Sequence, residues 1–113
     1  PLVAQHASIA TTPMTLPAVS AGFYRVNIYQ TITTADPVSS SLVTTIGWTD
    51  GGVAKSFATT GLTTPAAYTT AANDSVVKMI HIDNSSPITY AVTYSSNTPN
   101  MMQYALGVVV EKL

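Results

Sequence analysis

The side chains that could carry acid–base, nucleophilic or metal chemistry are few in this chain. It has five acidic residues, two histidines and no cysteine, so thiolate chemistry and disulfides are excluded for these residues. His6 and His81 lie in different segments, and neither has a carboxylate at the spacing of a metal-binding motif. A three-ligand zinc site would need a distant acid such as Asp50 or Asp83. We therefore expect structural or surface histidines and no metal or other cofactor.

Catalytic arrangements of serine and carboxylate are equally unsupported. Serine is abundant, yet no Gly-x-Ser-x-Gly motif occurs. Glu111 stands apart from the other acids, and most aspartates fall in segments with turn composition, where Asp is common for conformational reasons. A Ser-His-Asp triad or a pair of glycosidase carboxylates would therefore have to arise from chance geometry. We predict that the protein is not an enzyme.

The low charge of the chain bears on its partners. Charged residues make up 8% of the sequence and sum to a net charge of −1, whereas about a quarter of an ordinary soluble domain is charged. No window reaches the roughly 18 consecutive apolar residues of a membrane helix. A membrane partner is therefore not expected. A nucleic-acid partner is not expected either, because the basic residues are scattered along the chain. They are Arg25, Lys55, Lys78 and Lys112.

Weak charge has two interpretations. A subunit that packs against neighbours benefits from weak self-repulsion. A surface kept in solution by serine and threonine hydroxyls would have the same composition, and the sequence favours neither interpretation.

The elements that must position these residues are strands. Thr, Val, Ile and Tyr dominate the ordered segments, Pro and Gly recur between them, and no segment has a helical apolar period. A length of 113 residues fits one domain. We predict an all-β, antiparallel β-sandwich of jelly-roll type with seven to eight strands. The strands are expected at 22–32, 42–49, 53–59, 76–83, 88–95 and 101–113, with a short one near 67–70.

Alternation in 22–32 is especially clear. Tyr24, Val26, Ile28 and Ile32 fall on one face of this predicted strand. The other face carries polar residues together with aromatic ones, including Phe23 and Tyr29. An aromatic and a polar group exposed together could bind a sugar or a partner subunit.

A tight hairpin is predicted at Asp50-Gly51-Gly52, because the two glycines supply the positive φ angles of a short turn. Trp48, the single tryptophan, shares a strand face with Leu42 and Ile46. We expect its indole in the core near the end of this hairpin, with its N–H hydrogen-bonded locally, rather than on a ligand-binding surface. The segments 76–83 and 88–95 are expected to pair with each other as a second hairpin.

The N-terminal segment differs in composition from the rest. Residues 1–21 are rich in Ala, Thr, Ser and Pro, and Pro13 and Pro17 limit ladder hydrogen bonding. We predict an extended arm that packs on a neighbouring subunit, or an edge strand of its own sheet, followed by one β-sandwich domain at 22–113. Residues expected at subunit contacts are Leu2, Val3, Ile9, Met14, Leu16, Phe23, Tyr29 and Met101.

Three segments together resemble a known family. They are AGFYRVNIYQTITTA (21–35), IGWTDGG (46–52) and ITYAVTYSSNTPNMMQYALGVVVEKL (88–113). Their order is similar to that of small β-sandwich virion proteins of tailed bacteriophages, which are capsid decoration (cement) proteins or terminal domains of virion fibres. The resemblance covers about residues 20–113, and its motifs are structural, without a catalytic signature.

The resemblance implies a homotrimeric cement protein on the outer capsid surface, assembled in the bacterial cytoplasm, that binds and clamps major capsid subunits. In that role 1–21 is expected to contact the capsid or a subunit, and strands 22–32 and 101–113 to form the trimer-proximal sheet. The alternative is a fibre tip that binds host surface glycan through loops 33–41, 60–74 and 96–100. A carbohydrate-binding module of a cellular enzyme ranks last, because no aromatic platform is evident in the sequence.

Overall fold

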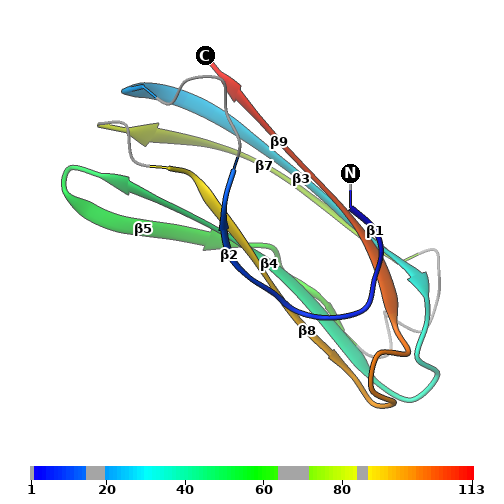
Figure 1. Cartoon of the computed structure of the whole chain (residues 1–113). Helices are drawn as coiled ribbons and strands as arrows, with labels where there is room; N and C mark the ends of the chain where they lie inside the picture. Colours follow the sequence, from blue (N-terminus) through cyan, green and yellow to red (C-terminus); the bar gives the residue numbers. More distant parts are fainter. Residues whose placement is uncertain (1, 15–19, 64–71, 84–86) are drawn as a thin grey trace.

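The computed structural model describes residues 2–14, 20–63, 72–83 and 87–113. Within this part of the chain there are nine strands and no helix, so no helix that could cross a membrane. Figure 1 shows two layers of strands in an elongated body. Its extents along the principal axes are 44 × 21 × 21 Å. The strands are β1 (Leu2–Gln5), β2 (Ile9–Pro13), β3 (Gly22–Thr34), β4 (Ser40–Asp50), β5 (Val53–Ala58), β6 (Leu62–Thr63), β7 (Asn73–Ile82), β8 (Thr89–Ser96) and β9 (Gln103–Lys112).

The strand order is that of a jelly roll. Sheet A has the order β1-β9-β3-β7, sheet B has the order β2-β8-β4-β5, and β6 adds to β4. Four antiparallel pairs are nested in the sequence: β4 with β5, β3 with β7, β2 with β8, and β1 with β9. The chain is thus one long hairpin wound into two sheets. This arrangement confirms the predicted all-β, antiparallel sandwich.

The expected second hairpin is wrong. β7 pairs with β3 in sheet A, whereas β8 pairs with β4 and β2 in sheet B. In this arrangement the partners are nested around the central β4–β5 turn, and consecutive strands from β6 to β9 lie in alternate sheets. Turn composition at Asn84-Ser85-Ser86-Pro87 was compatible with either connection. Residues 84–86 lie outside the described part of the chain.

The core lies between the two sheets, and strand alternation selects its residues. The predicted inward face of β3 is buried, and so are the inward faces of β4 and β9. Gln30 also falls on the inward face of β3 and is fully buried. Core side chains that are at most 2% exposed include Tyr24, Val26, Ile28, Ile32, Leu42, Ile46, Ile82, Ile88, Val92, Met102, Tyr104 and Leu106.

The N-terminal segment adds an edge strand to each sheet. β1 pairs with β9 in sheet A, and β2 pairs with β8 in sheet B. The chain crosses from one layer to the other between them (Figure 1). The hydroxyl of Tyr104, on β9, donates a 2.8 Å hydrogen bond to the carbonyl of Ala7 in this crossing. The short strand expected near 67–70 lies outside the described residues.

The turn at the centre of the nested hairpin has the predicted form. Asp50 pairs with Val53, which leaves a two-residue loop. Gly51 and Gly52 have φ angles of 62° and 72°. Two consecutive positive φ angles define a type I′ turn, whose twist matches that of the flanking strands.

Candidate interaction surface

The outer face of sheet A carries a concentration of exposed apolar side chains. They come from its two central strands, β3 and β9, and from its edge strand β7. Each is 50–63% exposed. Large apolar side chains scattered singly are ordinary on a protein surface, but a contiguous group marks an interaction site. This group, called here the sheet A face, consists of Phe23, Tyr29, Val77, Met79 and Val109.

Strand register places these residues next to one another. Val77 on β7 and Val109 on β9 flank Asn27 of β3 from either side. Met79 lies beside Arg25, one step further along the same face. The apolar residues therefore form a band across three strands, with odd-numbered residues outward on each.

Gly107 leaves a shallow depression in this band next to Tyr29. It is the register partner of Tyr29 on β9. A Cβ built on Gly107 would meet nothing within 4 Å. Because Gly107 has no side chain, the sheet surface next to Tyr29 has free space into which a side chain of another molecule can fit.

Polar side chains, including one positive and one negative charge, lie among the apolar residues of this band. The side-chain amide of Asn27 donates hydrogen bonds to Glu111 Oε1 at 3.1 Å and to the Val109 carbonyl at 3.3 Å. Arg25 is the register neighbour of Glu111 but makes no ion pair with the described residues. A partner could thus be oriented on the face by one guanidinium and one carboxylate.

A contact between the two sheets holds one end of the face. The rings of Phe23 and His81 lie 4.7 Å apart between centroids. His81 Nδ1 lies 2.9 Å from Asp50 Oδ1 of sheet B, and the Gly52 N–H donates to Asp83 Oδ2 at 3.1 Å. The type I′ turn is therefore tied to the end of β7 and to the sheet A face.

These contacts bring together residues that the sequence analysis had considered for metal binding. Asp50 does lie beside His81, and Asp83 binds the nearby turn. Within the described residues, however, no group of three His, Cys, Asp or Glu side chains could hold a metal ion. These side chains instead form hydrogen bonds that connect the two sheets. Asp50 Oδ2 also lies 4.0 Å from Lys55 Nζ.

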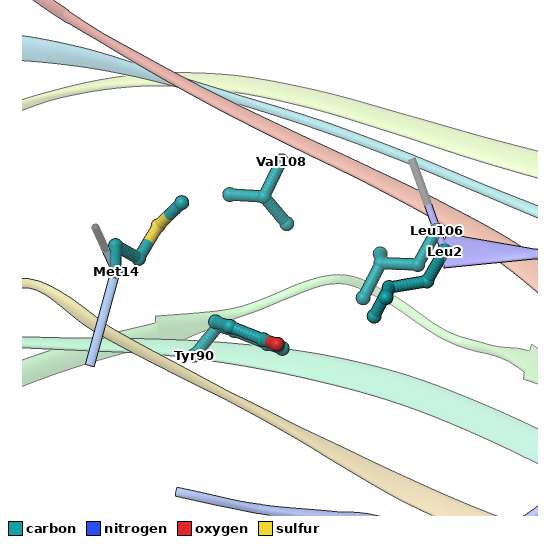
Figure 2. Close-up of a pocket in the computed structure, with 5 residues that line it drawn as sticks. All are labelled: Leu2, Met14, Tyr90, Leu106 and Val108. Atoms are coloured by element: carbon teal, nitrogen blue, oxygen red, sulfur yellow. The ribbon is translucent and has the colours of Figure 1, made fainter. Parts of the chain in front are cut away.

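An apolar pocket opens between the sheets at the opposite edge of the sandwich. It has a volume of about 250 Å³. Its walls come from both layers and from the end of the N-terminal segment, and Figure 2 shows the side chains around one common space. The residues are Leu2, Met14, Tyr90, Leu106 and Val108.

The interior beside this pocket is strongly shielded from water. Burial raises the pKa of Tyr104 to about 12, with smaller contributions from the neighbouring hydroxyls of Tyr94 and Tyr90. The Tyr94 hydroxyl donates a 2.6 Å hydrogen bond to the Met102 carbonyl. The hydroxyls of Tyr94 and Tyr104 are therefore bound to backbone carbonyls, as expected for phenols packed against a core.

Trp48 lies at the edge of the core rather than inside it. Its indole is half-buried and packs edge-on against Phe57, with 5.8 Å between ring centroids. Its N–H has no hydrogen-bond partner among the residues described, so the predicted local hydrogen bond is wrong. The residue borders a shallow hollow on sheet B together with Lys55 and Thr89.

Two of the loops proposed for glycan binding are joined by a buried carboxylate. Asp36 accepts hydrogen bonds from the Thr98 N–H at 2.7 Å, the Ser96 hydroxyl at 2.8 Å and the Val38 N–H at 2.9 Å. These donors hold the pKa of Asp36 below its ordinary value, led by the Thr98 N–H. The loops 33–41 and 96–100 therefore form one fixed tip.

The structure separates the expected contact residues into groups. Val3, Phe23, Tyr29 and Met101 are exposed, and Phe23 and Tyr29 belong to the sheet A face. Leu16 lies outside the described residues. Those that are half-buried against the core of their own chain are Leu2, Ile9 and Met14.

Sequence reasoning did not select Val77, Met79 and Val109. The sequence does indicate that Val109 faces outward, because it lies between the predicted inward residues Val108 and Val110. On β7 both faces carry apolar residues, so alternation does not identify the exposed face. Only the pairing of β7 with β3 shows which side faces outward.

Comparison with known proteins does not identify a relative of this chain. No protein-family model matches the chain, and a search of curated proteins finds no match.

Proposed function

We propose that this protein is a non-enzymatic structural component of a tailed-bacteriophage virion, a capsid decoration protein that binds major capsid subunits as a homotrimer. The sheet A face is the surface through which its copies pack. Residues of the N-terminal segment that remain exposed, such as Val3, contact the capsid. The protein acts on the outer surface of the head, after assembly in the bacterial cytoplasm.

The observation that carries the proposal is the sheet A face itself. Five large apolar side chains, each at least half exposed, lie on one side of one sheet. Water contact with such a band is unfavourable, at about 25 cal/mol per Å² of apolar surface. A standard interface buries roughly 800 Å² on each partner and has an apolar centre with a polar surround.

Two further features support a structural role. Jelly rolls occur in viral capsid and lectin domains, which is an argument from fold and not from a site. The net charge of −1 provides little self-repulsion between copies. Both features agree with the resemblance of residues 20–113 to phage virion proteins.

The test compares two valines of similar exposure. Val109, on the sheet A face, is 58% exposed, and Val38, in the tip loop, is 56% exposed. We expect wild type and Val38→Glu to be trimers by light scattering and to co-pellet with undecorated capsids. Val109→Glu should shift the mass toward monomer and weaken pelleting by at least tenfold, because it buries a carboxylate in the trimer interface. A monomeric wild type that ignores capsids contradicts the proposal.

The alternative is the terminal domain of a phage fibre that binds host surface glycan. The tip fixed by Asp36 and the hollow beside Trp48, with its unpartnered indole N–H, favour it. In that case the protein would bind host cells and not capsids. Loss of cell binding in Trp48→Phe, with oligomeric mass unchanged, would then support the glycan-binding function.

A further inference from the structure

The apolar pocket between the sheets has the dimensions and chemistry of a small-molecule site. Its volume of about 250 Å³ exceeds that of a cavity of about 150 Å³ that binds benzene in another protein. The available space fits a molecule on the order of ten non-hydrogen atoms. Its lining is a thioether, three aliphatic side chains and one phenol (Figure 2).

The phenol gives the pocket its polar group. Tyr90 lies across the pocket from Val108, and its hydroxyl points along the pocket toward Leu2 and Leu106 (Figure 2). Among the residues described, no group hydrogen-bonds to this hydroxyl. The other two tyrosines nearby, Tyr94 and Tyr104, bind backbone carbonyls. Tyr90 is therefore the one of the three whose hydroxyl proton is not already donated to a described residue, so it is free to donate to a ligand.

We propose that this pocket binds a small apolar molecule that carries a single hydrogen-bonding group, of the size of an alkylphenol. The apolar part contacts Met14, Leu106 and Val108, and the polar group exchanges a hydrogen bond with the Tyr90 hydroxyl. Such a ligand bridges sheet A, sheet B and the N-terminal segment. It therefore stabilises the folded chain against unfolding. This inference does not depend on the proposed function.

The probes are 4-propylphenol and propylbenzene, which differ by one hydroxyl. Titration of the full chain is followed by NMR of the methyl groups of Leu2, Met14, Leu106 and Val108. We expect saturable shifts at these methyls and a rise in melting temperature with probe concentration. Absence of saturable shifts with either probe overturns the proposal, as does saturation confined to methyls elsewhere.

A second valine provides a matched control. Val108 lines the pocket, whereas Val53 lies on β5 at the far edge of sheet B and is 58% exposed. Val108→Phe should fill the space and abolish binding of both probes, and Val53→Phe should leave binding unchanged. Equal binding by wild type and a folded Val108→Phe overturns the proposal.

Tyr90→Phe keeps the shape of the pocket and removes the hydroxyl, so it decides the question even where Val108→Phe does not fold. We expect about a fivefold loss of 4-propylphenol affinity, the equivalent of one neutral hydrogen bond. Propylbenzene affinity should stay within twofold. If the two probes lose affinity equally, or neither does, the role assigned to Tyr90 is overturned.

Discussion

The carboxylate of Asp36 accepts a hydrogen bond from the Thr98 N–H across 2.7 Å, which joins two loops 62 positions apart in the chain. Asp36 is 1% exposed and follows the end of β3, while Thr98 follows β8. The Asn97 N–H donates to the Ser39 carbonyl at 2.8 Å in the same tip. One buried acid thus fixes the end of the sandwich.

This acid predicts a loss of stability at low pH. Because the folded-state pKa of Asp36 lies below its ordinary 3.8, the stabilisation is complete above that ordinary value. It is lost as the pH falls through the folded-state pKa. Urea midpoints followed by Trp48 fluorescence should therefore fall steeply below pH 4 in wild type. Asp36→Asn should be less stable at pH 7 and show a shallower decline.

Glu111→Gln is the control for this experiment, because Glu111 is an exposed carboxylate. Its urea midpoint should follow wild type across the pH range. A decline in Asp36→Asn as steep as in wild type would show that other acids govern acid unfolding.

The buried polar contact between the sheets should be strongly coupled. Thr44 Oγ1 donates to Gln30 Oε1 at 2.8 Å, and Gln30 Nε2 donates to Thr59 Oγ1 at 3.2 Å. Thr44→Val leaves Gln30 Oε1 without this donor in the core. We expect a loss of about 1–3 kcal/mol in the free energy of unfolding.

A double-mutant cycle measures this coupling. Gln30→Met with Thr44→Val removes both partners, so the double variant should lose less stability than the sum of the single variants. Additive urea-unfolding energies would show that the 2.8 Å contact contributes nothing specific.

The type I′ turn should tolerate asparagine better than alanine. Gly52 has a φ of 72°, and a Cβ built there meets nothing within 4 Å. The cost of substitution is therefore conformational. We expect Gly52→Ala to lose about 1–2 kcal/mol and Gly52→Asn to lose less, because Asn is favoured in this turn. Equal urea midpoints for the two variants would contradict the conformational explanation.

Deletion of residues 1–18 should destabilise the domain. The deletion removes β1 and β2 and exposes the edges of β9 and β8, which are prone to intermolecular pairing. Leu2, Ile9 and Met14 also lose their packing on the core. A fully buried side chain of this kind contributes about 1.5–3 kcal/mol, so these half-buried ones should together contribute at least about 2 kcal/mol.

Urea unfolding and light scattering check this prediction. The truncated chain should show a lower midpoint and a broader mass distribution than wild type. A midpoint equal to that of wild type would show that both edge strands are dispensable. Val3→Glu offers a milder test of capsid contact, since Val3 is 63% exposed and its change leaves both strands in place.

The sequence by itself determined the class of fold, the inward faces and the central turn. Alternation identified the buried side of β3, β4 and β9 because successive side chains point to opposite faces of a sheet. The Asp50-Gly51-Gly52 turn followed from local conformational preference. These properties depend on residues close together in the chain.

Tertiary structure alone decided which strands pair and which faces stay in contact with water. The composition of the connecting segment predicted that β7 and β8 pair as a hairpin. A strand's partner depends on packing between the two sheets, however, and the residues near that strand in the sequence do not encode it. The same reason explains the burial of Gln30 and Asp36. The sheet A face exists because β3, β7 and β9 lie side by side, and that adjacency spans most of the chain.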